Sequence, residues 1–271
     1  MRYGIEVVPF GAYSNPREVV RLAQAAEAAG WEALALWDHL LFPYGTGDPW
    51  VTLSAVAAAT RRLRLITAVA PLPRYRPQLL ARTVAALDLL SEGRVIFGTG
   101  LGVDFDLAPF GDPTDARTLA AMLDEGLELM TGLWSGEPVT HRGRFYRAEA
   151  ARLVPTPAQR PRVPIWIGGD SPAALRRAAR WDGWIVGTVD EHCQITKPPE
   201  RLAEQVALLR QHRGDGPPLE VVVDGVSAAG DRALPAAYAE AGATWWLEAI
   251  FGARGSIEEM LARVSAGPPA P

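Results

Sequence analysis

Residues 63–102 read LRLITAVAPLPRYRPQLLARTVAALDLLSEGRVIFGTGLG, and this stretch indicates the fold. The apolar run over residues 63–69 is short and leads to a proline, which is typical of a buried strand. Over residues 77–90 the apolar side chains recur at helical spacing, and Gly93 is suited to the left-handed position that closes such a helix. A second buried strand follows at residues 94–98. The stretch therefore predicts one strand–helix–strand unit that ends in a glycine-rich loop.

The same unit recurs along the whole chain, as eight apolar segments that each precede a helical one. The expected strands are residues 3–8, 32–37, 63–69, 94–98, 164–168, 183–187, 219–224 and 244–248. The expected helices are residues 16–29, 50–60, 77–90, 116–133, 172–180, 199–213, 234–241 and 257–264. This alternation predicts the α/β class, and eight units suffice to close a (β/α)8 TIM barrel. An open, doubly wound sheet is the alternative.

One segment interrupts the rhythm of strands and helices. Residues 134–162 contain SGEPVTHRGRFYR and then a proline-rich return, which predicts a small hairpin insertion between the fourth helix and the fifth strand. No linker divides the rest, so we expect a single domain over residues 1–265. Residues 266–271 are rich in proline and glycine, and we expect them to form a flexible tail.

Composition excludes several classes of protein and partner. The chain has 271 residues, of which 48% are hydrophobic and 21% charged, as in an ordinary globular domain. The net charge of −4 argues against nucleic acid and against an anionic membrane surface as partners, because both require a basic protein surface. Cys193 is the only cysteine, so no internal disulfide forms. With no signal peptide or membrane-spanning run expected, the cytoplasm is the predicted compartment.

A glycine-rich turn after the fifth predicted strand is a candidate anion site. It consists of Gly168, Gly169, Asp170 and Ser171, followed by a proline. The serine can cap the next helix, whose free N–H groups and dipole favour a phosphate. Thr188, after the next strand, can supply a hydroxyl to the same group. The alternative is an ordinary capped helix, and the segment by itself does not decide between the two.

Asp38 and His39 follow the second predicted strand. A histidine there can donate or accept a proton near neutral pH. The alternative is a structural pair in which Asp38 orients His39 or caps a turn. Gly98, Thr99 and Gly100 end the fourth strand at the same rim of the expected barrel. They do not form a dinucleotide fingerprint, because the next helix begins too far away, near residue 116.

Taken together, these motifs resemble the luciferase-like flavin- and deazaflavin-dependent oxidoreductases. The matching residues are Leu87, Asp88, Leu90, Ser91, Gly93 and Arg94, then Gly98, Gly100 and Gly102, and then Pro164, Trp166, Ile167, Gly168, Gly169, Ser171 and Pro172. The resemblance implies a TIM barrel that binds FMN or coenzyme F420, with the cofactor phosphate near the glycine-rich turn and Thr188. It also implies a cis peptide between Ala68 and Val69 beneath the cofactor ring, close to Gly98, Thr99 and Gly100. In the deazaflavin-using branch, a histidine in the position of His39 lies beside that ring.

The resemblance implies a monooxygenase-like oxidoreductase that oxidises or reduces a small organic substrate. His39 and Asp38 would be its catalytic residues. It also implies a homodimer, for which the alanine-rich residues 55–59 and 81–86 allow close helix approach. Asp104, Phe105 and Asp106 stand where many relatives carry a Glu-Phe pair, so we do not predict glucose-6-phosphate oxidation.

Two alternatives remain open. One is a non-catalytic flavin-binding relative, since the chain is compact for the family. The other is a metal-dependent barrel hydrolase that uses Asp38, His39 and His192, although the paired histidines usual in such sites are missing and we predict no metal. Glu248, at the end of the last strand, has two interpretations, contact with the substrate or pairing with an arginine, and we expect the pairing.

Overall fold

The computed structural model describes residues 1–269, and within this range nine strands form one sheet. Eight of them close a parallel barrel, because β3 pairs with β5 as well as with β2 and because β1 pairs with β11. In ring order these are β1 (Arg2–Val7), β2 (Ala33–Leu36), β3 (Arg64–Thr67), β5 (Val95–Gly100), β8 (Ile165–Gly168), β9 (Gly183–Val186), β10 (Glu220–Gly225) and β11 (Trp245–Ile250). The short β4 (Ala70–Pro71) pairs with the end of β5. The predicted barrel is confirmed, and the open sheet is excluded.

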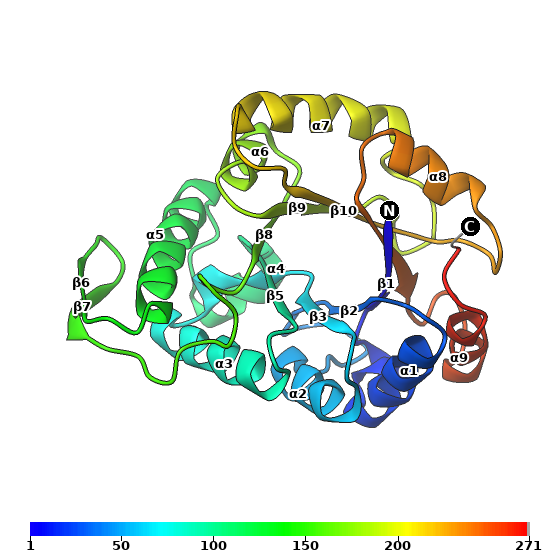
Figure 1. The fold of residues 1–271 in the computed structure, drawn as a ribbon, viewed down its shortest axis with the longest axis horizontal. Coiled ribbons are helices and arrows are strands. Elements are labelled where there is room, and N and C mark those ends of the chain that lie inside the picture. Colours follow the sequence, from blue (N-terminus) through cyan, green and yellow to red (C-terminus); the bar gives the residue numbers. More distant parts are fainter. Residues whose placement is uncertain (270–271) are drawn as a thin grey trace.

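Helices surround the barrel (Figure 1). They are α1 (Pro16–Ala28), α2 (Pro49–Ala59), α3 (Pro77–Leu90), the short α4 (Asp104–Leu107), α5 (Ala116–Trp134), α6 (Pro172–Ala178), α7 (Pro199–Arg213), α8 (Ala233–Glu240) and α9 (Ile257–Ser265). Side chains of Asn15, Asp48, Asp115, Ser171 and Ser256 accept backbone N–H groups at helix starts. Such caps, with proline in the first turn of several helices, explain why the expected bounds are close to those observed.

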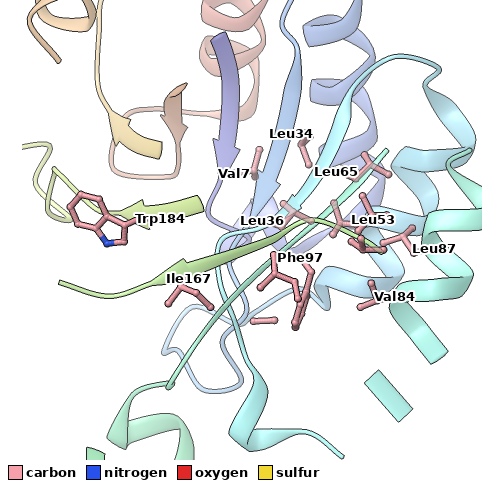
Figure 2. Packing of buried hydrophobic residues seen from close by; sticks show 14 of the residues in the cluster. Val7, Leu34, Leu36, Leu53, Leu65, Val84, Leu87, Phe97, Ile167 and Trp184 are labelled. Carbon is pink, nitrogen blue, oxygen red and sulfur yellow. The ribbon is translucent and has the colours of Figure 1, made fainter. Parts of the chain in front are cut away.

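The strands separate two apolar layers. Along β2, Leu34 and Leu36 point outward and pack against the helices, whereas Ala33 and Ala35 point into the barrel. Figure 2 shows the outward leucines in the outer layer with Phe97. The barrel interior is filled by Ile66, Ile96, Trp166, Ile185, Val222, Trp245 and Leu247. The barrel is therefore a packed core, and ligands are accommodated at its ends.

The predicted hairpin insertion is present between α5 and β8. It pairs β6 (Val139–Arg142) with β7 (Arg147–Ala151) in antiparallel fashion and lies on the outer side of α5 (Figure 1). The Glu125 carboxylate of α5 accepts the backbone N–H groups of Phe145 at 3.0 Å and Tyr146 at 2.6 Å. These charge-assisted bonds fix the hairpin to the helix.

The predicted tail is only partly within the described residues. The carbonyl of Gly267 accepts a hydrogen bond from Arg263 at 3.0 Å, and Pro269 is buried. Part of the predicted tail therefore contacts the domain, and its flexibility stays a prediction, while residues 270–271 lie outside the described range. Over residues 1–269, no helix has the length and apolar character needed to cross a membrane.

Candidate active site

A cleft of about 470 Å³ opens at the carboxyl-terminal ends of β2, β3, β5 and β8. This volume is in the usual range for small-molecule sites. The predicted site residues that line it are Asp38, His39, Ala68, Val69, Gly100, Gly168, Gly169, Asp170 and Ser171. Further lining residues, which include Trp37, Asp106 and Arg177, were not expected there. The sequence therefore predicted the rim at which the cleft opens and part of the cleft wall.

Glycines allow the backbone of three strands to form one wall of the cleft. The side chain of Val69 lies between Gly100 and Gly168, and a Cβ at either glycine would lie 3.0 Å from a Val69 methyl group. Such a contact is too close for ordinary packing. The peptide bond between Ala68 and Val69 is cis, as the resemblance implied. The wall therefore presents backbone and small side chains, which allow a flat ring to approach closely.

Gly98 and Thr99 support this wall from behind. A Cβ at Gly98 would lie 1.9 Å from the carbonyl oxygen of Thr67, so only glycine fits there. The buried hydroxyl of Thr99 donates to the carbonyl of Ala70 at 2.8 Å. Neither residue lines the cleft, and their contact with the cofactor stays a prediction.

His39 is held at the cleft by a carboxylate from a distant segment. Its Nδ1 lies 2.7 Å from Oδ2 of Asp106, in α4. The other oxygen of Asp106 accepts the backbone N–H groups of Leu40 at 3.1 Å and Leu41 at 2.7 Å. With the carboxylate ionised, Nδ1 carries the proton and Nε2 is left for other partners. Asp106 was not predicted as a partner of His39, because the two residues are 67 positions apart in the sequence.

Asp38 does not orient His39, which corrects that interpretation of the pair. Its carboxylate instead accepts hydrogen bonds from Arg74 and from the Tyr75 hydroxyl, the latter at 2.6 Å. Burial raises the pKa of Asp38, although the guanidinium of Arg74 opposes that rise. Nη1 of Arg74 also lies 3.6 Å from Asp106. Arg74 therefore contacts both carboxylates, and Asp38 is linked to Asp106 through this arginine.

The glycine-rich turn after β8 lies at the opposite side of the cleft from His39. The Ser171 hydroxyl accepts the N–H of Ala174 at 3.1 Å, which is the predicted helix cap. Asp170 pairs with Nζ of Lys197 at 2.9 Å. Burial opposes ionisation, but hydrogen bonds from Gln205 and Lys197 more than offset it and lower the pKa of Asp170. The charge of Asp170 is thus neutralised by a lysine, which reduces its repulsion of an anion.

Thr188 is not among the residues that line the cleft, and its contact with a phosphate stays a prediction. Its side chain is fully buried, its hydroxyl donates to the carbonyl of Asp224, and its N–H donates to the Asp224 carboxylate. Burial raises the pKa of Asp224 to about 6. Burial, and next the charge of Asp224, raise the pKa of Glu6 well above its usual range. Asp224 and Glu6 lie on the barrel strands β10 and β1.

The remaining charged candidates have structural partners. Glu248 is fully buried and pairs with Arg254 at 2.7 Å and Arg263 at 3.3 Å, so the predicted arginine pairing is confirmed. The side chain of His192 is 77% exposed and does not line the cleft with Asp38 and His39. Over residues 1–269, no group of three or more histidines, cysteines and acids is arranged to hold a metal ion.

Comparisons with known proteins agree with this fold. A family profile described as luciferase-like monooxygenase matches residues 4–263. An uncharacterised protein of Mycobacterium tuberculosis is 32% identical over 248 residues, which cover 79% of this chain and 82% of that protein. An F420-dependent glucose-6-phosphate dehydrogenase of Nakamurella multipartita is 37% identical over 180 residues, which cover 63% of this chain and 52% of that enzyme. An F420-dependent secondary alcohol dehydrogenase, solved with an F420–acetone adduct, superposes with a TM-score of 0.82 at 17% identity, covering 99% of this chain and 98% of that one. At that identity, the likeness to the alcohol dehydrogenase speaks for the fold alone.

Proposed function

The chain belongs to the luciferase-like monooxygenase family, and we propose that it is an oxidoreductase that uses FMN or F420 in the cleft described above. The observation that carries this proposal is the His39–Asp106 pair, which lines the same cleft as the glycine-rich wall. The reaction is the oxidation or reduction of a small organic molecule. The name of the Nakamurella relative supports F420, and the monooxygenase description of the family supports a reduced flavin.

The cleft suits a tricyclic cofactor with a phosphate. Ala68, Val69 and Gly100 offer a flat wall for the ring, and any side chain at Gly100 would meet Val69. The turn over residues 168–171 offers backbone N–H groups to the phosphate. The one acid in this turn, Asp170, is paired with Lys197. When bound, the oxidised cofactor would accept the hydride that leaves an oxidised substrate, and the reduced cofactor would donate a hydride to a reduced one or, as a reduced flavin, would activate dioxygen.

His39 carries the proton chemistry in this proposal. Asp106 holds the proton on Nδ1, so Nε2 accepts a proton from a substrate hydroxyl or, once protonated, donates one to a developing oxyanion. The Asp106 carboxylate stabilises the resulting imidazolium, and the bonds from Leu40 and Leu41 keep that carboxylate in place. Asp38 does not touch His39 and acts through Arg74, so in our proposal it is a positioning residue rather than a catalytic one.

Separate fluorescence titrations with FMN and F420 test the proposal. We expect saturable binding of at least one of them. The variant Ala173→Glu should weaken that binding about tenfold or more, because this exposed residue of α6 lines the cleft beside the glycine-rich turn and its new negative charge would repel the phosphate. A change at Gly169 is a poorer test, because its φ of +117° strains any side chain. Ala236→Glu, at an exposed position of α8, is the matched control. Absence of binding by both cofactors contradicts the proposal, and tight binding without any turnover favours the non-catalytic alternative.

A homodimer in the cytoplasm remains part of the proposal. Ala81 and Ala85, on which the dimer was predicted, are buried within the chain itself. The same helix nevertheless exposes Leu79 at 51% and Leu90 at 52%, and Val51 of α2 is 61% exposed. Exposed apolar side chains on neighbouring helices are suited to an interface between two copies.

A further inference from the structure

Aromatic rings surround His39, which lines the cleft away from the glycine-rich turn over residues 168–171. The Phe105 ring stacks on the imidazole, with 5.5 Å between centroids and 13° between planes. Trp37 and Phe42 each lie 5.7 Å from the imidazole, and Phe10 lies 5.9 Å from it. Aromatic faces of this kind favour planar or apolar groups over strongly hydrated ones. The proton-transfer residue is thus set in an apolar surrounding.

The mouth of the cleft near His39 is apolar at the surface as well. In the loop after β2, Leu40 is 45% exposed and Tyr44 is 70% exposed. In the segment after β5, Val103 is 38% exposed and Phe105 is 48% exposed. Val103 lines the cleft, and Phe105 stacks on His39, so this exposed surface is continuous with the site. Large exposed apolar side chains that gather at a cleft indicate a ligand-binding surface.

The charges at this end of the cleft disfavour an anion. Among the described residues that line the cleft, Arg177 is the only arginine or lysine, and it pairs with Asp124 at 2.8 Å. Arg74, close to His39, is nearly buried and already bound by Asp38 and Asp106. In the proposed function the backbone N–H groups of residues 168–171 bind the cofactor phosphate, so a second phosphate near His39 would need a free arginine or lysine, and none lines this end of the cleft among the described residues.

We infer that the substrate is a neutral, apolar molecule with a hydroxyl or carbonyl group, bound between the aromatic side chains around His39, and that phosphorylated sugars are excluded. This inference rests on the proposed function, since it names the substrate class of the same cleft. The hydroxyl or carbonyl oxygen lies at Nε2 of His39, and the remainder of the molecule packs on Phe105 and the apolar mouth. The activity in the name of the Nakamurella relative is thus not that of this chain.

Calorimetric titration of the protein, loaded with whichever oxidised cofactor binds, tests the inference. The neutral probes are benzyl alcohol and cyclohexanone, and the anionic ones are benzoate and glucose 6-phosphate. We expect the neutral probes to bind at least about tenfold more tightly than the anions. Phe105→Ala should weaken binding of benzyl alcohol by about tenfold, through the lost aromatic contact, and leave cofactor affinity unchanged. Phe110→Ala removes an exposed phenylalanine of the same segment and is the matched control.

The outcomes separate this inference from the proposed function. If neither cofactor binds, the proposed function fails and the inference fails with it. If a cofactor binds but glucose 6-phosphate binds as tightly as benzyl alcohol, or neither neutral probe binds, the inference alone is overturned. Equal effects of Phe105→Ala and Phe110→Ala overturn it too. Sedimentation of the Phe105→Ala variant as a monomer, when the wild type is a dimer, would assign the apolar mouth to a subunit interface and likewise overturn it.

Discussion

Replacing Asp106 with asparagine removes one charge at the centre of the proposed site and changes little in shape. Oδ2 of Asp106 lies 2.7 Å from Nδ1 of His39, and the side chain is 2% exposed. An amide accepts the imidazole proton less well than a carboxylate does, and it no longer compensates the charge of an imidazolium. We therefore expect kcat to fall by about 10²-fold, the lower end of the range for a positioned acid or base, with KM little changed. Hydrogen bonds to a charged group contribute about 1.5–3 kcal/mol, so unfolding free energy should decrease by a similar amount.

The assay is steady-state turnover with a saturating cofactor, beside urea unfolding of each variant. Asp104→Asn makes the same chemical change at an exposed acid of the same short helix, and it should leave turnover unchanged. The double variant with His39→Ala should be no slower than His39→Ala alone, because the two residues act as a unit. Losses that multiply in the double variant would refute this reasoning. So would an Asp106→Asn enzyme whose folded fraction has full activity.

Three further changes have defined outcomes. His39→Ala should lower turnover by about 10²–10⁴-fold while the melting temperature changes little; early melting with normal turnover of the folded fraction would make the residue structural. Burial raises the pKa of Asp224 to about 6, so the folded state holds that proton more tightly than the unfolded state. Its contribution to stability is full at low pH and is lost as pH rises from about 4 to about 6. Asp224→Asn should make the free energy of unfolding nearly independent of pH over that interval. If the variant loses stability with rising pH as steeply as the wild type does, other groups cause the pH dependence. Leu79→Glu, at an exposed site on α3, should convert the proposed dimer to a monomer in sedimentation, whereas a monomeric wild type would contradict the dimer.

The barrel could be predicted because its signals are local. Proline at the start of a helix, a capping side chain such as Asn15, and the glycine after α3 each act within a few residues of the chain. Strand ends in a parallel barrel meet at one rim whatever the side chains are. For this reason the sequence predicted the rim and part of the cleft wall without any distance information.

The partners of the polar residues could not be predicted in the same way. Asp38 and His39 are adjacent in sequence, yet they contact different partners, Arg74 and Asp106, which lie in other segments of the chain. The one available signal was the unusual position of Asp106, close to the glutamate expected from the resemblance. The partners of Thr188 were likewise not predicted, because a hydroxyl at a strand end can face the cleft or a neighbouring strand, and here it donates to the carbonyl of Asp224.

A crystal structure of the protein with the tighter of the two cofactors tests the central claim most directly. We predict that the ring lies against Ala68 and Val69, that the phosphate contacts residues 168–171, and that Nε2 of His39 faces the substrate side of the ring. A cofactor bound elsewhere on the barrel, or a ring whose reactive face is turned away from His39, would contradict the proposed site.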